Sequence, residues 1–311
     1  MSAAIERKIV LVTRRTRLEE LVTRYHTLAQ ARFYIEHLGA DFSDYLRENA
    51  AYSVGLQVAV QALQAWGRYQ IVDRALLPNF VFAPDDIVVA LGQDGLVANT
   101  MKYLSGQALV GVNPEPSRWD GVLLPFQPND LAALLNDVAG NRRPVRSVTM
   151  AEARLSDGQT MRAVNDLFIG PKTHTSALYE IQLGDRRESQ SSSGIIVSTG
   201  LGSTAWMRSI ITGSLRIASA VQPADRQYEF RPQPWDSEQL VFAVREPFPS
   251  KSSSAELVYG TISADQPLTL RSRMPDNGVI FSDGMENDYL RFTAGLEATI
   301  TLAEQRGRLV I

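Results

Sequence analysis

The four residues Gly92-Gln93-Asp94-Gly95 have the composition of a phosphate-binding loop. They follow the apolar run 86–91, which is typical of a buried parallel strand, and precede residues 96–104, which have helical character. At such a junction the N–H groups that begin the helix attract phosphate oxygens, and glycine lets these oxygens approach. The carboxylate of Asp94 is unfavourable beside a phosphate unless it meets a metal ion or accepts the proton of an attacking hydroxyl. The alternative is an ordinary Asp-Gly turn.

A second polar stretch, Ser191–Trp206, contains Gly200-x-Gly202-x-x-Ala205, which has the outline of a dinucleotide-binding fingerprint. That fingerprint belongs in a strand–helix–strand unit, whereas the surrounding sequence is rich in short strands. A helix start still offers N–H groups and hydroxyls, so Ser203 and Thr204 are candidate ligand-binding residues. The ring of Trp206 could stack on a base or a nicotinamide, or it could pack in the core.

Two further polar groups stand in apolar surroundings. Asn165 and Asp166 interrupt an apolar run, and their burial is unfavourable unless their hydrogen bonds are satisfied. Their polar tips suit ribose hydroxyls or the edge of an adenine ring, although a turn at a strand end is the alternative. Residues 281–286 include Asp283-Gly284, and this segment is typical of a hairpin turn.

The elements that must position these residues fall into two groups. In the first part of the chain we predict a strand at Lys8–Thr13, helices at Thr16–Leu38 and about Asp41–Trp66, and a parallel strand–helix–strand unit over residues 86–112. A short helix at Leu131–Asn141 closes this part. The sequence therefore predicts an α/β domain of Rossmann-like type over residues 1–141.

Beyond about residue 146, short runs of alternating polarity predict a mainly antiparallel β domain of sandwich type, which we place at residues 142–311. Residues 161–169 are predicted as one strand, and the serine-rich segments 189–193 and 252–254 are predicted as loops. The fold class expected for the whole chain is thus α/β plus all-β.

Composition limits the possible partners. With 31 Lys and Arg against 34 Asp and Glu, the 311-residue chain has a net charge of −3, which disfavours nucleic acid as a partner. The chain has no Cys, which excludes thiolate chemistry. Its three His residues lie far apart in the sequence, which disfavours an imidazole-built metal site. No apolar run has the length of a signal-peptide core or a membrane span, so we expect a cytoplasmic protein without a membrane partner.

Taken together, the order and spacing of these motifs resemble the NAD kinase family. The family pattern is a Gly-Gly-Asp-Gly loop, an Asn-Glu or Asn-Asp pair in a β domain, and an Asp-Gly-x-x-x-Ser-Thr-x-x-Gly-Ser-Thr-Ala-Tyr segment. Here these stand as Gly92–Gly95, Asn165-Asp166 and Ser193–Trp206. The resemblance covers most of the chain and is nearest to the divergent mitochondrial-type branch, whose features recur at Val110–Asn113 and Phe242–Pro247.

The resemblance implies an NAD kinase/diacylglycerol kinase-like fold and a homodimeric enzyme that uses ATP and Mg²⁺ to phosphorylate the adenosine-ribose 2′-hydroxyl of NAD(H), forming NADP(H). It implies that Asp94 holds and deprotonates that hydroxyl, and that no protein side chain is needed as a metal ligand. Phosphate and ATP binding is implied for Gly92, Gln93, Gly95 and Asn113. NAD binding is implied for Asn165, Asp166, Ser193, Thr199, Ser203, Thr204, Ala205 and Trp206.

Four residues depart from the family pattern. Gln93 replaces a glycine, and it would be strained if the position required a positive φ. Leu96 stands in place of a Thr, Ser193 in place of an Asp, and Trp206 in place of a Tyr. Two alternatives stay open. A lipid or diacylglycerol-type kinase of the same fold shares the Gly-Gly-Asp-Gly loop and the two-domain plan, and Gln93 and Leu96 are the evidence for a dinucleotide-binding sensor with weak catalysis. NAD and NADH are both candidate acceptors, and ATP and polyphosphate are both candidate donors.

Overall fold

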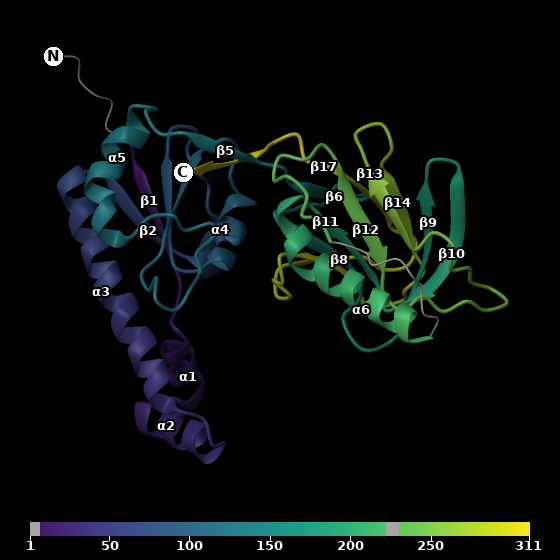
Figure 1. Cartoon of the computed structure of the whole chain (residues 1–311), viewed down its shortest axis with the longest axis horizontal. Helices are drawn as coiled ribbons and strands as arrows, with labels where there is room; N and C mark the ends of the chain where they lie inside the picture. The colour runs from purple at the N-terminus through teal and green to yellow at the C-terminus, as the bar shows by residue number, and fades with distance from the viewer. Residues whose placement is uncertain (1–6, 222–229) are drawn as a thin grey trace. The chain divides into compact units, whose positions relative to one another are not determined.

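The computed structural model describes residues 7–221 and 230–311, and the chain divides into two compact units (Figure 1). Unit 1 extends to Arg146 and includes Arg308–Ile311, and unit 2 is Ser147–Gly307. We expected the domain boundary after residue 141, and the structure has it after Arg146. The assignment of the last residues to the β domain is corrected, because strand β18 (Gly307–Val310) pairs in parallel with β4 (Ala108–Val112) in the sheet of unit 1.

Unit 1 is built on a six-stranded sheet with the order β2-β1-β3-β4-β18-β5, and the pairs from β2 to β18 are parallel. Strands β1, β3 and β4 are buried along their whole length, because α3 and α5 pack on one face of the sheet while α4 contacts β3 and β4. Its other elements are β1 (Ile9–Thr13), α1 (Arg17–Tyr25), α2 (Leu28–His37), α3 (Phe42–Trp66), β2 (Tyr69–Asp73), β3 (Ile87–Leu91), α4 (Asp94–Met101), α5 (Leu131–Ala139) and β5 (Val145–Val148). The predicted strand–helix–strand unit is therefore confirmed.

The single helix predicted over residues 16–38 is wrong, because the structure has two helices there. Thr16 caps α1 as expected, but His26 takes a left-handed conformation with φ 67° and ends the helix. Thr27 then caps α2 by accepting a hydrogen bond from the backbone N–H of Gln30. The sequence signal that was missed is this second threonine N-cap within an otherwise helical pattern.

Unit 2 is a sandwich of two six-stranded antiparallel sheets, with the orders β10-β9-β14-β17-β6-β7 and β13-β12-β11-β8-β15-β16. Their facing side chains form one large core, and helix α6 (Trp206–Val221) packs on the outer face of the second sheet (Figure 1). The strands are β6 (Ala151–Leu155), β7 (Thr160–Ala163), β8 (Asp166–Pro171), β9 (Ala177–Leu183), β10 (Arg186–Ser192), β11 (Ile195–Ser198), β12 (Leu240–Val244), β13 (Tyr259–Ile262), β14 (Leu268–Ser272), β15 (Gly278–Ser282), β16 (Tyr289–Arg291) and β17 (Glu297–Leu302).

Two expectations for unit 2 are corrected. The strand predicted over residues 161–169 is interrupted at Val164-Asn165, so that β7 and β8 lie in different sheets. The serine-rich segment 189–193 is mostly strand β10, which pairs with β9. Its polar side chains are tolerated because the hydroxyl of Tyr179 hydrogen-bonds Gln190 and Ser192, each at 2.8 Å. Satisfied polar groups can be buried in a sheet at little cost.

Candidate functional site

The predicted phosphate loop lies where β3 ends and α4 begins, at the carboxyl edge of the parallel sheet. Gly92 donates its N–H to the carbonyl of Val112 at 3.0 Å, which fixes the loop to β4. Gln93 is the N-cap of α4 with φ −122°, so its replacement of a glycine introduces no left-handed strain. Its side chain makes no capping hydrogen bond to the first turn of α4. The loop thus keeps the open helix start that suits an anion.

Asp94 is the first residue of α4 and is partly exposed. Its Oδ1 accepts a hydrogen bond of 2.6 Å from the backbone N–H of Leu123, in the segment that follows β4. In the part of the chain that the structure describes, Oδ2 has no hydrogen-bond partner. The carboxylate is therefore oriented by one oxygen and has the other available to a ligand.

The neighbours of Asp94 differ in accessibility. Gly95 is exposed, and a Cβ at this position would meet nothing within 4 Å. Leu96 is 1% exposed and fills the space beside Gly92, where a Thr hydroxyl is usual in the resembled family. Asn113 is buried, and its amide bridges its own loop by accepting from the N–H of Glu115 at 3.0 Å and donating to the carbonyl of Trp119 at 3.1 Å. Asn113 thereby stabilises the loop after β4.

In unit 2 the tertiary structure brings two of the predicted motifs together. Thr199 donates its N–H to the carbonyl of Asn165 at 3.0 Å, and its hydroxyl bonds the carbonyl of Val164 at 2.5 Å. A Cβ on Gly202 would lie 1.9 Å from the carbonyl oxygen of Asn165. The glycine is therefore required for close backbone approach, and the Asn165-Asp166 pair lies directly against the turn that begins at Gly200.

That turn is a 3₁₀ helix over Leu201–Thr204, followed by α6. Ser203 is buried, donates its hydroxyl to the carbonyl of Gly200 at 2.7 Å and accepts from the N–H of Gln233 at 3.1 Å. Thr204 and Ala205 are exposed. Ser203 therefore holds the turn, whereas Thr204 and Ala205 are accessible to a ligand.

Asp283 was predicted only as a hairpin residue, and the structure gives it a second contact. It lies in the loop between β15 and β16, with φ 54° at Asp283 and φ 71° at Gly284, which confirms the hairpin. Its carboxylate also accepts hydrogen bonds from the backbone N–H groups of Val164, Asn165 and Asp166. Burial, together with the nearby negative charge of Asp283, raises the pKa of Asp166 to about 7.

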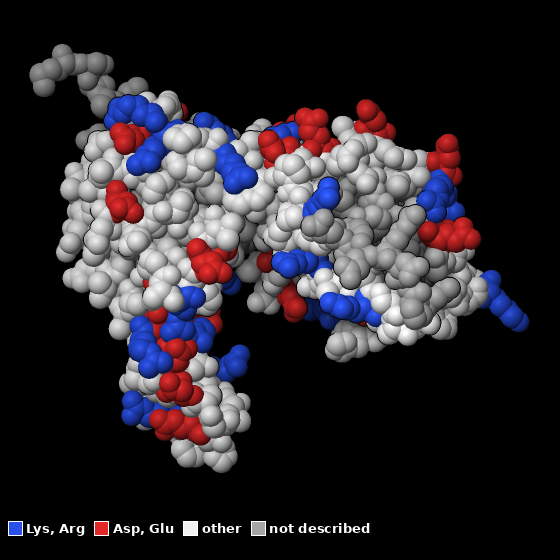
Figure 2. Space-filling model, in the orientation of Figure 1, with Lys and Arg blue, Asp and Glu red and all other residues white. Residues whose placement is uncertain are grey.

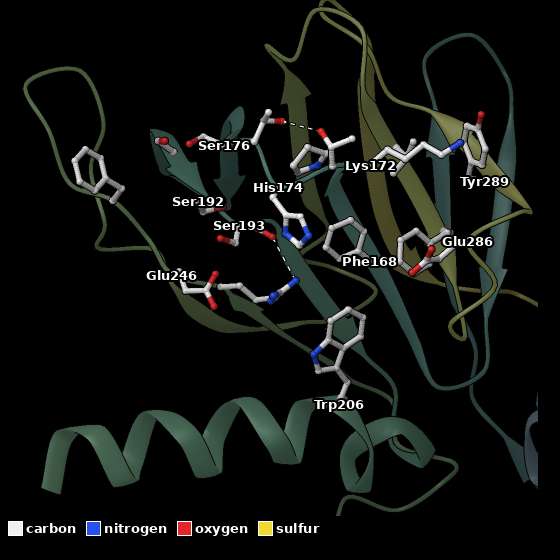
Figure 3. A pocket seen from close by; sticks show the side chains of 18 residues that line it. Phe168, Lys172, His174, Ser176, Ser192, Ser193, Trp206, Glu246, Glu286 and Tyr289 are labelled. Atoms are coloured by element: carbon white, nitrogen blue, oxygen red, sulfur yellow. Dashed lines mark hydrogen bonds between the residues drawn. The ribbon is translucent and has the colours of Figure 1, made fainter. Parts of the chain in front are cut away.

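A cavity of about 610 Å³ opens beside this cluster on unit 2 and is lined by Ser193 and Trp206 (Figure 3). Trp206 is stacked on Phe168 with ring centroids 5.9 Å apart and planes 5° apart, and the guanidinium of Arg245 lies 5.3 Å from the tryptophan ring. His174 and Phe168 line the same cavity (Figure 3). The half-buried side chain of Trp206 thus packs on Phe168 and also lines the cavity.

Sequence reasoning did not select the basic residues of this cavity. Arg245 packs over Trp206 and its Nη1 lies 3.5 Å from the carbonyl of Ser193. Lys172 lies 4.4 Å from the ring of Tyr289 and also lines the cavity. Arg245 belongs to the Phe242–Pro247 segment, so its place in that motif was the available signal. Nothing local in the sequence marks Lys172.

Across residues 7–221 and 230–311, no group of three or more His, Cys, Asp or Glu side chains is placed to hold a metal ion. Within the same ranges, no helix combines the length and apolar character needed to cross a membrane.

Comparison with solved structures identifies the fold. A yeast NADH kinase in complex with NADH superposes with a TM-score of 0.56 at 12% identity, covering 98% of this chain and 83% of that one. The chain has the fold of the NAD kinases. An NAD kinase from Archaeoglobus fulgidus in complex with ATP also gives a TM-score of 0.56, at 14% identity, with 98% of this chain and 93% of that one covered. No protein-family model matches the sequence. The sequence also has no significant match among curated proteins.

Proposed function

We propose that this chain is an NAD kinase that transfers the terminal phosphoryl group of ATP to the 2′-hydroxyl of the adenosine ribose of NAD(H). The observation that carries the proposal is Asp94, at the N-terminus of α4, oriented by the N–H of Leu123 and with its second oxygen unbonded within the described residues. The NAD kinase fold and the two structural neighbours, one in complex with NADH and the other with ATP, support the choice of substrates.

In the proposed reaction Asp94 accepts the proton of the ribose 2′-hydroxyl. The hydroxyl oxygen forms a bond to the terminal phosphorus while the bond from that phosphorus to the bridging oxygen breaks, and ADP leaves. Phosphoryl transfer needs mainly alignment and compensation of charge, so one oriented carboxylate beside an open helix start is a sufficient set of protein groups. Gly92, Gln93 and Gly95 would surround the donor phosphates, with the open N–H groups of α4 as donors.

The acceptor would bind to unit 2. The partly exposed Asn165 and the buried Asp166 lie against the turn that leads to Thr204 and Ala205. A carboxyl group with a pKa near neutrality, such as that of Asp166, can accept a hydrogen bond when ionised and donate one when protonated. The cavity lined by Phe168, Ser193 and Trp206 offers an aromatic wall of the size that a nicotinamide or adenine ring needs.

The Gly92–Gly95 loop is compatible with a magnesium ion that binds together with ATP. Mg²⁺ usually keeps several waters and binds through substrate phosphates, so the phosphates of ATP would supply its main ligands, and the unbonded oxygen of Asp94 stays available to the ribose hydroxyl. The ion, when bound with ATP, would neutralise charge on the phosphate oxygens.

We further propose a homodimer formed through unit 2, whose sandwich leaves four edge strands, β10, β7, β13 and β16. Unpaired sheet edges must be covered or protected, and pairing with a second copy would cover them. Light scattering at micromolar protein concentration measures the molar mass and tests this. The mass of a monomer would show that no second subunit contributes to the site.

The function is tested by a turnover screen. Purified protein is incubated with Mg²⁺, with ATP or polyphosphate as donor, and with NAD, NADH or diacylglycerol as acceptor. Formation of NADP or NADPH is the expected result. Turnover of diacylglycerol alone would favour the lipid kinase, and dinucleotide binding without any turnover would favour the sensor.

A further inference from the structure

Arg14 lies beside the phosphate loop although it is far from it in sequence. It is the first residue after β1, and Gly92 is the first residue after β3, the parallel neighbour of β1. A Cβ placed on Gly92 would be 3.4 Å from the Nε of Arg14 and 3.5 Å from its Cδ. The Cδ and Nε atoms of the arginine therefore pack directly against the Cα of the buried glycine.

The guanidinium of Arg14 is buried, and the donor at its Nε is unused. Its side chain is 9% exposed. Nη1 donates to the carbonyl of Arg15 at 3.0 Å, and Nη2 donates to Glu48 at 2.9 Å. Across residues 7–221 and 230–311, Nε has no hydrogen-bond partner. A buried, charged N–H without an acceptor is unfavourable, so native proteins that keep one usually supply the acceptor with a ligand or water.

The same guanidinium is held rigidly from the other side. Glu48 is 1% exposed and pairs with both Arg14 and Arg17. Burial alone would raise the pKa of Glu48, but the hydrogen bonds from Arg17 and Arg14 outweigh it and lower that pKa, so the carboxylate stays charged. The ring of Tyr52 lies 5.0 Å from the guanidinium carbon of Arg14, and the Tyr52 hydroxyl accepts the backbone N–H of Arg14 at 3.0 Å.

The ion pairs of Glu48 extend into a network of alternating basic and acidic side chains. Arg17 also bonds Asp44 at 2.8 Å, and Arg118 bonds the two oxygens of Asp44 at 3.0 and 2.6 Å. Figure 2 shows acidic and basic side chains interleaved over the helical part of unit 1 that carries α1 to α3. The network leaves Arg14 little freedom to move, and a donor that is fixed before the ligand arrives binds charge effectively.

We propose that Arg14 is a phosphate-binding residue, whose Nε–H donates a hydrogen bond to a phosphoryl oxygen of the donor held by the Gly92–Gly95 loop. The open N-terminus of α4 and the unused Nε of Arg14 adjoin the same glycine, so a phosphate at the loop receives hydrogen bonds from both. The identity of the donor as a nucleoside triphosphate rests on the proposed function. The phosphate contact itself does not depend on which acceptor is phosphorylated.

The test separates phosphate binding from the structural role of Arg14 as partner of Glu48. The double variant Arg14→Gln/Glu48→Gln removes the Nε–H donor together with the buried charge that it neutralises. Arg17→Gln is the matched control, because Arg17 bonds the same Glu48 without a contact to Gly92. Thermal unfolding verifies that each full-length variant is folded. Calorimetry then gives the dissociation constants of inorganic tripolyphosphate, ATP and NAD.

We expect the double variant to bind tripolyphosphate and ATP about 10- to 100-fold more weakly, since a hydrogen bond to a charged group is lost. Its affinity for NAD should stay within about twofold, and Arg17→Gln should bind all three molecules within about threefold of the unaltered protein. Unchanged tripolyphosphate binding in the folded double variant overturns the proposal. A loss confined to NAD also overturns it, because Arg14 would then serve the dinucleotide.

A measurement on the unaltered chain covers the case of a variant that does not fold. The NMR resonance of the Arg14 Nε–H, assigned through its side chain, should shift on addition of saturating tripolyphosphate. A resonance that stays in place, or a chain that does not bind tripolyphosphate, overturns the proposal. Neither readout uses NAD turnover, so failure of the proposed kinase activity is recognised separately.

Discussion

The Oδ1 atom of Asp283 lies 2.6 Å from the backbone nitrogen of Asn165, although 118 residues separate the two along the chain. The same carboxylate accepts the N–H groups of Val164 at 3.1 Å and Asp166 at 3.3 Å. A negative charge placed on three successive amides fixes the break between β7 and β8. Asn165 and Asp166 of the proposed acceptor site are therefore positioned by a residue of the β15–β16 hairpin, which the sequence pattern identifies only as a turn.

Asp283→Ala should destabilise the protein by about 2–4 kcal/mol, because the N–H groups of residues 164–166 lose a charged acceptor. Asp283→Asn should cost less, since the amide keeps one acceptor oxygen and Asn tolerates the left-handed φ of 54°. Urea unfolding measures both. Asp265→Ala, at an exposed residue in another hairpin, is the control and should change little. Equal effects of Asp283→Ala and Asp265→Ala would contradict a role for the amide contacts.

Asp94→Asn should lower kcat about 10²- to 10⁴-fold and leave the affinity for NAD within a few-fold. The amide oxygen can still accept the N–H of Leu123, but it cannot take a proton from the ribose hydroxyl. Steady-state kinetics with saturating ATP and Mg²⁺ give kcat, and calorimetry gives the affinity. The control is Asp157→Asn, at another Asp-Gly turn, where Asn should be fully tolerated. Near-normal turnover of Asp94→Asn would leave the loop as a phosphate-binding turn only.

The raised pKa of Asp166 predicts a pH-dependent stability. An unfolded Asp titrates near pH 4, whereas the folded one titrates at about 7, so between these values the folded state binds the extra proton. The free energy of unfolding contributed by this group therefore falls as pH rises from about 4 to about 7 and is constant above that range. Each pKa unit corresponds to about 1.4 kcal/mol, so the loss is at most about 4 kcal/mol.

Asp166→Asn removes this titration and tests the sign. The difference in stability between Asp166→Asn and the unaltered protein should move in favour of the variant as pH rises from 4 to 8. Urea unfolding at each pH measures it. A difference that is independent of pH, or one that moves the other way, would show that the carboxyl group is not held neutral by its surroundings.

Gly202→Ala should disrupt the proposed acceptor site, because the added Cβ would lie 1.9 Å from the backbone oxygen of Asn165. Backbone on both sides cannot move aside cheaply, so we expect destabilisation of about 2 kcal/mol or more together with weaker NAD binding. Gly213→Ala in α6 is the matched control. Its Cβ would meet nothing within 4 Å, and Ala should stabilise the helix by about 0.5–1 kcal/mol. Similar behaviour of the two variants in unfolding experiments would refute the close approach at Gly202.

The sequence by itself determined the elements whose causes are local. The strand β3, the loop at Gly92 and the helix α4 are consecutive, so hydrophobic pattern and turn residues specify the loop without reference to the rest of the chain. The same is true of α3, where Asp41 caps one end and Gly67 the other. The motifs also carried the resemblance to NAD kinases, and the observed fold agrees with it.

Only the tertiary structure decided which distant groups meet. The C-terminal strand β18 joins the sheet of unit 1 because its buried Leu309 and Val310 complete a parallel sheet, and no local pattern states which sheet a strand will enter. Asp283 reaches Asn165 and Arg14 reaches Gly92 through strand pairing, which brings residues together across long stretches of chain. The local sequence determines which secondary structure a residue favours. The partner that neutralises its charge or completes its hydrogen bonds is determined by the packing of the whole fold.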